Sequence, residues 1–342
     1  MQGPTVDVAP DVVCLGEALV LLPALAGEQA GAVSIGALPA GAVPMGALPA
    51  GAEANVAVGL AAAGLRPAWV GRVGDDPFGA FLLAGLRARG VDVGGVQVDP
   101  RRPTGCYAKE AGIGSDGEPA TRMHYRRAGS AASAMDPAFL GVPAVRDRLA
   151  AARIIHCSGI TAALSPTCAE VMRALLAGPG AAMVSFDVNW REQMWPGGDP
   201  AVVADLAARA DIVLVGADEA RRVFGTDDLP ALRRLLPGPR LIVVKDGADA
   251  ALTIDRHSRV VRQSALQVDV VEPVGAGDAF AAGLLAGLVR HEPVARCLRR
   301  GHLGAAAVLT VADDSAPPPD DALLDLSEAE WAQIRVSAAG VR

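Results

Sequence analysis

The sequence contains few aromatic residues, few cysteines and almost no lysine. Aromatic residues make up 4% of the 342 residues, and the 31 basic residues include only two lysines, Lys109 and Lys245. The formal net charge is −7, and no run of basic residues interleaved with aromatic residues occurs. Nucleic acids and anionic membranes bind such basic surfaces, so the composition argues against both as partners. A lysine in so arginine-rich a chain suggests that its position requires an amine.

The five cysteines are widely spaced and odd in number, and no CxxC pair occurs. Neither a disulfide framework nor a zinc site is indicated. We therefore expect the cysteines to be small buried residues of a protein in the reducing cytoplasm. No uninterrupted apolar stretch reaches transmembrane length. The apolar stretch at 12–25 contains Glu17 and has no basic residue before it, which favours a first strand over a signal peptide. The predicted location is the cytoplasm.

Short β-branched runs alternate with stretches rich in alanine and leucine, a pattern typical of a doubly wound α/β sheet. Strands are predicted at 11–14, 67–70, 154–156, 183–187, 212–215 and 241–245. Helices are predicted at 54–63, 80–89, 166–176, 202–210, 219–224, 229–236 and 279–289.

Two segments, 18–50 and 101–130, break this alternation because they are rich in turn residues or alternate with period two. We expect them to form a small separate sheet. The first segment contains a ten-residue unit, 31–40, that recurs almost unchanged at 41–50. Two copies are too few for a repeat architecture, so a duplication inside a tolerant loop is the simplest explanation.

The last part of the chain differs in composition from the rest. Three prolines at 317–319 follow Asp313, and an amphipathic pattern follows at 323–334. We therefore predict one domain over 1–312 and a C-terminal tail over 313–342 that carries a peripheral helix.

Residues 271–280 carry the strongest chemical signal. Gly275, Ala276 and Gly277 precede an apolar helix, so the first backbone N–H groups of that helix are open to an anion. A carboxylate beside a bound anion is electrostatically unfavourable, which indicates that Asp278 has a chemical role. A carboxylate there can accept the proton of a hydroxyl that attacks a phosphate. The structural alternative is a glycine turn with an acidic N-cap, which is common in globular proteins.

The stretch from Gly275 to Phe280 resembles the C-terminal motif of the PfkB (ribokinase-like) family of carbohydrate kinases. The family's N-terminal motif is matched at 50–57 and 71–79. Two separated motifs in the correct order are far more specific than either alone. The resemblance extends over nearly the whole chain.

This resemblance implies a ribokinase-like three-layer doubly wound sheet with a small β lid. The anion site would be the backbone amides of Gly275, Ala276 and Gly277, and Asp278 would be the general base. Phosphoryl transfer would use ATP, with Mg²⁺ held through phosphates and water near Glu219 rather than by a set of protein ligands. Lid sheets often pair across dimers in this family, which also implies a homo-oligomer.

The resemblance places the nucleotide along several strand ends. Three positions depart from the family pattern. Gly216 replaces a small polar residue, Gly301 replaces an asparagine near the adenine, and Glu272 replaces an aspartate beside a monovalent-cation loop. Potassium activation and base selectivity therefore do not follow from the resemblance. The implied cofactor-binding residues are Asn189, Glu219, Lys245, Gly247, Asp249, Gly275, Gly277 and Gly301.

The second lid segment separates the subfamilies. A neutral sugar needs hydroxyl partners, whereas an acid sugar also needs a planar guanidinium group that binds its carboxylate. Strand alternation places Tyr125 and Arg127 on one face and Arg126 on the other. The pattern resembles the 2-keto-3-deoxygluconate kinases. By that resemblance, the residues that hold the keto acid are Gly51, Asn55, Tyr107, Tyr125, Arg127, Arg191 and Asp278.

The sequence thus predicts an ATP-dependent kinase that converts 2-keto-3-deoxygluconate to its 6-phosphate, with the gluco or galacto epimer left open. Two alternatives also stay open: a neutral-sugar kinase of the fructokinase or ribokinase type, and a non-catalytic sensor of sugar acids. A dehydrogenase is disfavoured because no early strand runs into GxGxxG.

Overall fold

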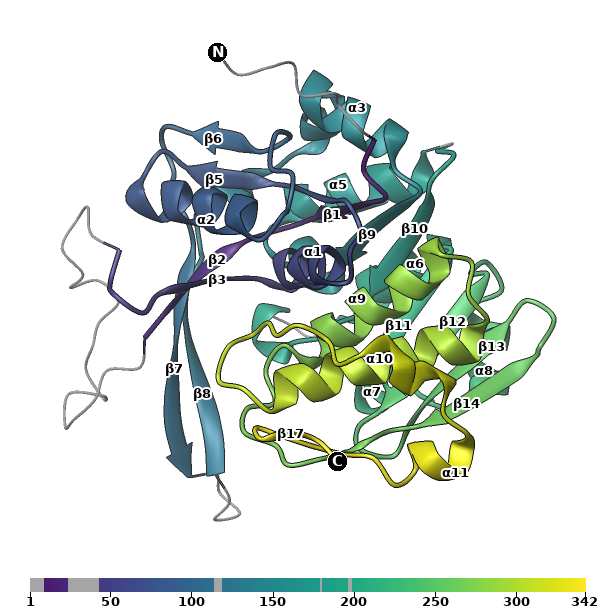
Figure 1. The fold of residues 1–342 in the computed structure, drawn as a ribbon. Coiled ribbons are helices and arrows are strands. Elements are labelled where there is room, and N and C mark those ends of the chain that lie inside the picture. Colours follow the sequence, from purple (N-terminus) through teal and green to yellow (C-terminus); the bar gives the residue numbers. More distant parts are fainter. Residues whose placement is uncertain (1–8, 24–42, 114–118, 179, 196–198) are drawn as a thin grey trace.

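A sheet of eight strands forms the centre of the molecule (Figure 1). The computed structural model describes residues 9–23, 43–113, 119–178, 180–195 and 199–342. Two antiparallel strands, β13 (Ala250–Asp255) and β14 (Val260–Ser264), form one edge of the sheet. The other strands run parallel, in the spatial order β12 (Leu241–Asp246), β11 (Ile212–Gly216), β10 (Met183–Asp187), β9 (Ile154–Ser158), β1 (Val12–Leu15) and β4 (Pro67–Val70).

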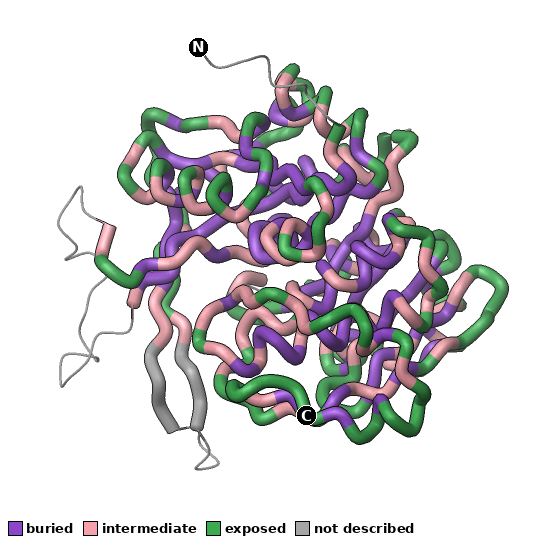
Figure 2. Tube along the Cα trace, in the orientation of Figure 1, coloured by how far each residue is buried: buried purple, intermediate pink, exposed green. Residues whose placement is uncertain are grey.

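Continuous apolar runs explain why the parallel strands are buried on both faces. In β1, Val13 and Leu15 pack into the core on one face of the sheet, and Val12 and Cys14 pack into the core on the other. Figure 2 shows the buried backbone that results along the central strands. The predicted parallel strands are confirmed, with ends that differ by one or two residues, whereas β13 and β14 were not predicted.

Helices cover both faces and complete the three layers (Figure 1). The predicted helices are confirmed, whereas the helices over Pro143–Ala151 and Val294–Leu309 were not predicted. On one face lie α1 (Ala52–Ala62), α2 (Pro77–Ala88), α9 (Ala276–Val289) and α10 (Val294–Leu309). On the other lie α3 (Pro143–Ala151), α5 (Pro166–Ala177), α6 (Ala201–Arg209), α7 (Ala217–Phe224) and α8 (Leu229–Leu235).

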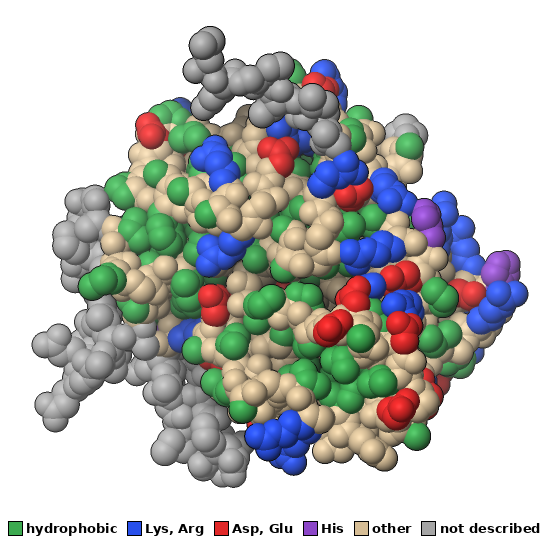
Figure 3. All heavy atoms as spheres, in the orientation of Figure 1, with side chains coloured by type: hydrophobic (Ala, Val, Ile, Leu, Met, Phe, Trp, Pro, Cys, Tyr) green, Lys and Arg blue, Asp and Glu red, His purple; other side chains and the backbone are tan. Residues whose placement is uncertain are grey.

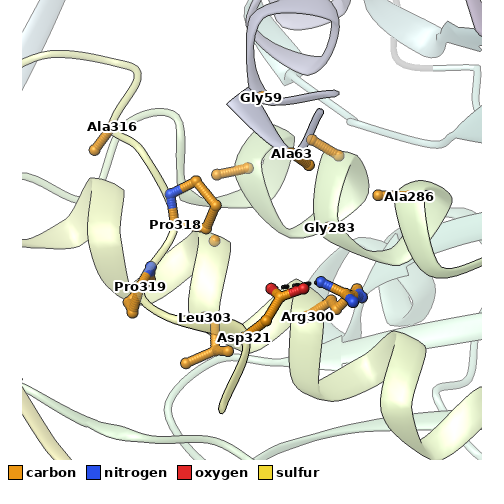
Figure 4. A pocket seen from close by; sticks show the side chains of 13 residues that line it. Gly59, Ala63, Gly283, Ala286, Arg300, Leu303, Ala316, Pro318, Pro319 and Asp321 are labelled. Carbon is orange, nitrogen blue, oxygen red and sulfur yellow. Dashed lines mark hydrogen bonds and ion pairs between the residues drawn. The ribbon is translucent and has the colours of Figure 1, made fainter. Parts of the chain in front are cut away.

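Glycines allow α9 and α10 to pack closely. A Cβ atom on Gly283 would lie 2.3 Å from the carbonyl oxygen of Arg300, so no side chain fits there. Beside this contact, α1, α9, α10 and the segment 316–321 enclose a cavity of about 30 Å³, where Arg300 donates a 2.7 Å hydrogen bond to Asp321 (Figure 4). Ligand pockets are about ten times larger or more, so this cavity is too small for a sugar or a nucleotide.

The segments that break the alternation meet in a separate four-stranded sheet, which we call the small sheet. Its strands are, in spatial order, β3 (Leu48–Ala50), β2 (Leu19–Leu22), β7 (Cys106–Ile113) and β8 (Pro119–Arg126). The hairpin of β7 and β8 extends away from the central sheet (Figure 1). The predicted doubly wound α/β fold with a separate small sheet is therefore confirmed.

The duplicated decapeptide is only partly described. Its first unit, 31–40, lies outside the described residues. The second unit ends in β3, which pairs antiparallel with β2 and leads into Gly51. The last three residues of this unit are thus part of the small sheet.

The expectation of a peripheral C-terminal tail needs correction. Trp331 is fully buried, and its indole N–H donates a 2.9 Å hydrogen bond to the carbonyl oxygen of Ser264. Ser327 caps a new short helix, α11 (Glu328–Trp331), which interrupts the helix predicted at 323–334. The chain then forms β16 (Arg335–Ser337), which pairs with β15 (Gln267–Val268). The apolar side chains of this segment, which are spaced as in an amphipathic helix, instead form a small core with α10.

The surface offers two further observations. Over α10 and the C-terminal segment, arginine and acidic side chains lie side by side (Figure 3), as in the ion pairs of Arg296 and Arg300 with Glu292. Within the described ranges, every helix is too short or too polar to cross a membrane.

Candidate active site

A cavity of about 820 Å³ opens where β10, β11 and β12 end, between the start of α9 and the small sheet. Ligands gather beyond the carboxyl ends of strands in sheets of this kind, and the volume is in the range of ligand pockets. Most of the predicted site residues line it, namely Gly51, Asn55, Tyr107, Tyr125, Arg127, Asn189, Arg191, Glu219, Lys245, Gly275, Gly277 and Asp278.

Asp278 lies in the first turn of α9. Burial raises the pKa of its carboxyl group from 3.8 to about 7; the hydrogen bond from Asn55 opposes this rise, and the carboxylate of Asp187 adds to it. A carboxyl group with a pKa near neutrality is suited to take up a proton at physiological pH.

In the turn before α9, glycines leave the backbone accessible from the cavity. Gly275 has a φ of 88°, which favours glycine, and a Cβ atom there would lie 2.8 Å from the carbonyl oxygen of Asp314. A Cβ atom on Gly277 would lie 3.6 Å from Lys245 Nζ. Ala276 begins the helix. The first N–H groups of α9 have no partner within the helix, so they and the Lys245 ammonium group offer a site that suits a phosphate.

Lys245 and Asp187 form an ion pair in the cavity wall, with 2.8 Å between Nζ and Oδ2. Burial alone would lower the pKa of Lys245, but the carboxylates of Asp187 and Glu219 outweigh it and raise the pKa. The amine therefore stays charged at neutral pH.

Two buried oxygens in the same wall have no hydrogen-bond partner. They are Asp187 Oδ1 and Asn189 Oδ1. Asn189 also has a φ of 38°, a conformation that few non-glycine residues adopt. Carboxylate and amide oxygens are ligands that suit Mg²⁺ and its bound water, so these residues fit the magnesium ion that the fold family implies.

Glu219 lines the cavity but already has protein partners. Its Oε2 accepts a 2.9 Å hydrogen bond from the N–H of Gly216, and its Oε1 accepts a 3.0 Å hydrogen bond from Arg191. The first contact is the half of a capping box that the Glu219 side chain supplies at the start of α7, and Gly216 has no side chain to supply the other half.

Two tyrosines and two arginines also line the cavity. Tyr107 and Tyr125 are paired across β7 and β8, and their rings stack with centroids 5.4 Å apart. The Arg127 guanidinium carbon lies 5.2 Å from the centroid of the Tyr125 ring. Tyr125 and Arg127 share the cavity face, as the strand alternation predicts.

Arg127 also has a partner inside the protein. It donates a hydrogen bond to the buried carboxylate of Glu17, which accepts a second one from Ser130 at 3.0 Å. Among the described residues, the Arg191 guanidinium group donates through Nη1 alone, to the Trp190 carbonyl oxygen and to Glu219, and its side chain is 54% exposed. Of the two guanidinium groups, Arg191 is therefore the freer to bind a ligand.

Sequence reasoning missed Asp314. This residue lies in the segment predicted to be a tail, yet it lines the cavity and accepts a hydrogen bond from the Tyr107 hydroxyl. Burial and the Asp314 carboxylate raise the pKa of Tyr107. The available signal was a pair of acidic residues, Asp313 and Asp314, a few residues after a helix with buried glycines.

Three predicted cofactor residues do not line the cavity. Gly247 has a φ of 49° in the turn between β12 and β13, and Asp249 pairs with exposed Arg262 at 2.9 Å. Gly301 faces α9, where a Cβ atom would lie 2.8 Å from the ring of Phe280. The absent side chain at 301 is explained by helix packing.

The model of the pfkB family carbohydrate kinases matches residues 40–321. The chain belongs to this family. The predicted family is thus confirmed, and so is the prediction of an enzyme, a sugar kinase that transfers a phosphoryl group. The sensor alternative is wrong.

Two relatives carry names of the predicted subfamily. A 2-dehydro-3-deoxygalactonokinase of Haloferax volcanii is 33% identical over 272 residues, which cover 77% of this chain and 82% of that protein. A 2-dehydro-3-deoxygluconokinase of Thermoproteus tenax is 32% identical over 272 residues, which cover 78% and 81%. A fructokinase of Klebsiella pneumoniae is 34% identical over 249 residues, which cover 70% and 76%.

Solved structures agree with the fold of this PfkB kinase. The crystal structure of a PfkB protein from Polaromonas sp. JS666 has a TM-score of 0.73 and 34% identity, and covers 93% of this chain and 100% of that one. An uncharacterized sugar kinase from Pyrococcus horikoshii, solved in complex with ATP, has a TM-score of 0.74 and 25% identity, and covers 94% and 99%. Membership of the family implies that ATP is the phosphoryl donor.

Proposed function

We propose that this kinase phosphorylates 2-keto-3-deoxygluconate, or its galacto epimer, on the terminal hydroxyl to give the 6-phosphate. One observation carries the proposal: a cavity that holds Asp278 also holds two guanidinium groups and two stacked tyrosines. A neutral sugar offers no carboxylate for an arginine to bind. The names of the Haloferax and Thermoproteus relatives, which differ in the epimer, support the same substrate class.

In the proposed reaction, Asp278 accepts the proton of the terminal hydroxyl as that oxygen attacks the γ-phosphorus of ATP. The bond from the γ-phosphorus to the bridging oxygen breaks, and ADP leaves with that electron pair. The amides of Gly275, Ala276 and Gly277 would hold the charge on the transferring group, with Lys245 beside them. Asn55 would keep the carboxylate of Asp278 in place.

Magnesium would supply charge neutralisation on the phosphates when bound. Asp187 and Asn189 would hold the hydrated ion through their unpartnered oxygens, on the side of the cavity where Glu219 also lies. Tyr107, Tyr125, Arg127 and Arg191 would bind the keto acid, while Gly51 and Asn55 would contact its hydroxyl groups.

One observation favours a second candidate, a neutral-sugar kinase. Arg127 already neutralises the buried Glu17, so one of the two guanidinium groups has a role without any ligand. In that case only Arg191 would distinguish an acid from a neutral sugar.

A substrate screen tests the proposal. The purified protein is incubated with ATP and Mg²⁺ and with each of 2-keto-3-deoxygluconate, its galacto epimer, fructose and ribose, and ADP release is followed. We expect kcat/KM for one keto acid to exceed that for either neutral sugar by about 10²-fold, as one charge-assisted hydrogen bond provides. Carbon–phosphorus coupling in the product spectrum should identify the 6-phosphate. Equal or faster use of fructose or ribose would contradict the proposal.

A further inference from the structure

Lys109, one of the two lysines, connects the small sheet to the two segments that carry Glu272 and Asp314. It lies on β7, and its Nζ is 2.7 Å from Asp314 Oδ1 and 3.4 Å from Glu272 Oε2. The side chains of Lys109, Glu272 and Asp314 are 12%, 14% and 3% exposed. One nearly buried ammonium group thus bridges two carboxylates from distant parts of the chain.

Both carboxylates belong to segments that shape the turn before α9. Glu272 Oε1 accepts a 3.2 Å hydrogen bond from the N–H of Val274, the residue directly before Gly275. The backbone of Asp314 packs against Gly275, so closely that a Cβ atom there would not fit. Any contact that holds Glu272 and Asp314 together therefore also holds this turn.

The charges around the turn require a cation. Asp278, Glu272 and Asp314 are three acidic residues close to backbone amides that would bind a phosphate, and like charges repel at such distances. A cation paired directly with Asp278 would lower the pKa of this carboxyl group and weaken it as a base. Lys109 does not line the cavity, so it can offset the other two carboxylates without contacting a ligand.

We propose that Lys109 is a positioning residue, an internal cation that fixes the turn before α9 and makes phosphoryl transfer independent of free monovalent ions. The proposal rests on the proposed role of the Gly275–Gly277 amides. The monovalent-cation loop of the family does not fit this chain at Glu272, because both oxygens of that carboxylate have partners: the Val274 N–H and Lys109.

Lys109→Met tests the proposal, because it keeps the length of the side chain and removes its charge. Activity is measured on the best substrate of the screen in tetramethylammonium chloride, whose cation is too large to enter a closed site, and then with added potassium, ammonium or methylammonium. For the unchanged protein we expect less than about a twofold difference among these salts. For Lys109→Met in tetramethylammonium, we expect kcat to fall about tenfold or more, the change caused by about 1.4 kcal/mol. The KM for the sugar should change less.

Small cations should restore kcat of Lys109→Met in a saturable manner, and Lys109→Arg should keep most of the activity. Arg335→Met removes an exposed ion pair with Asp269 and is the matched control, with no salt effect expected. The proposal is overturned if the unchanged protein needs potassium, if Lys109→Met has normal kcat, or if no small cation restores the variant although its melting temperature is normal.

Calorimetric titration with ADP and Mg²⁺ separates this proposal from the proposed substrate, because it needs no sugar. Weaker nucleotide binding by Lys109→Met, restored by ammonium, supports the internal cation even if the sugar-acid assignment fails. Unchanged nucleotide binding together with unchanged kcat contradicts it, whichever sugar is used. A variant that does not fold is replaced by Lys109→Gln, to which the same outcomes apply.

Discussion

The side-chain amide of Asn55 donates a 2.8 Å hydrogen bond to Asp278 Oδ2, across 223 residues of sequence. It joins the first turns of α1 and α9, the two helices that begin at the matched family motifs. Hydrogen bonding to a carboxylate favours its ionised form, whereas burial disfavours it. The balance of the two sets the proton affinity of the proposed base.

Activity should therefore depend on pH through Asp278. Only the ionised carboxyl group can accept a proton, so kcat/KM should rise about tenfold per pH unit below the pKa of about 7 and level off above it. Asn55→Leu removes a donor that lowers this pKa, so the midpoint of the profile should move to higher pH. Steady-state kinetics from pH 5.5 to about 9 measures both. A midpoint that stays in place in Asn55→Leu would show that another group titrates.

Asp278→Asn should reduce kcat by about 10² to 10⁴-fold, because it removes the base and leaves the amides in place. Nucleotide affinity should change little. Near-normal turnover in this variant would falsify the mechanism.

The same variant has a consequence for stability. A folded-state pKa raised from 3.8 to about 7 means that the carboxyl group stabilises the folded state below its unfolded pKa, and that this contribution is lost as the pH rises through about 7. As the pH rises between these two pKa values, Asp278→Asn should thus become increasingly more stable than the unchanged protein. Melting temperatures at pH 5 and at about pH 8 test this, since the gain should be larger at the higher pH.

Arg191→Met should raise the KM for a keto-deoxy sugar acid by at least about tenfold, and the KM for a neutral sugar much less. Arg191 is the cleaner test because Arg127 pairs with buried Glu17. Arg127→Met would leave that carboxylate buried without its partner, which costs about 3–5 kcal/mol of stability. Arg222→Met, which removes an exposed pair with Glu192, is a matched control. An unchanged ratio of acid to neutral sugar in Arg191→Met contradicts the acid-sugar assignment.

Deletion of one decapeptide unit should be tolerated. Either deletion, 31–40 or 41–50, leaves the sequence Gly-Ala-Leu-Pro-Ala before Gly51, so β3 can still form. Loop closure changes by only about 0.6 kcal/mol per doubling of length, so melting temperature and kcat should stay within a small margin. Deletion of both units removes β3 and should destabilise the small sheet. Loss of folding after a single deletion would show that the repeat is part of the core.

The parallel strands could be predicted because a strand buried on both faces is apolar throughout, as in 212–215. The turn at Gly275 could be predicted because small residues before an acid and an apolar helix form a local pattern. By contrast, β13 and β14 depend on pairing with β12, which no local pattern specifies. Apolar and polar residues alternate less clearly in β13 and β14 than they would in a half-buried hairpin.

Asp314 and Gly301 illustrate two further limits. The role of Asp314 arises from side chains on β7, more than two hundred residues away, and the prolines after it read locally as a tail. Gly301 was assigned by resemblance to the nucleotide, but in three dimensions it makes room for Phe280. A position in a motif does not reveal which neighbour required the residue.

The cavity takes one wall from Gly51 and another from Asp314. During synthesis, the cavity cannot be completed until residue 314 has left the ribosome. A chain that stops before Asp314 would lack the partner of Tyr107 and Lys109. Phosphoryl transfer by this protein therefore requires that segments from both ends of the kinase domain have met.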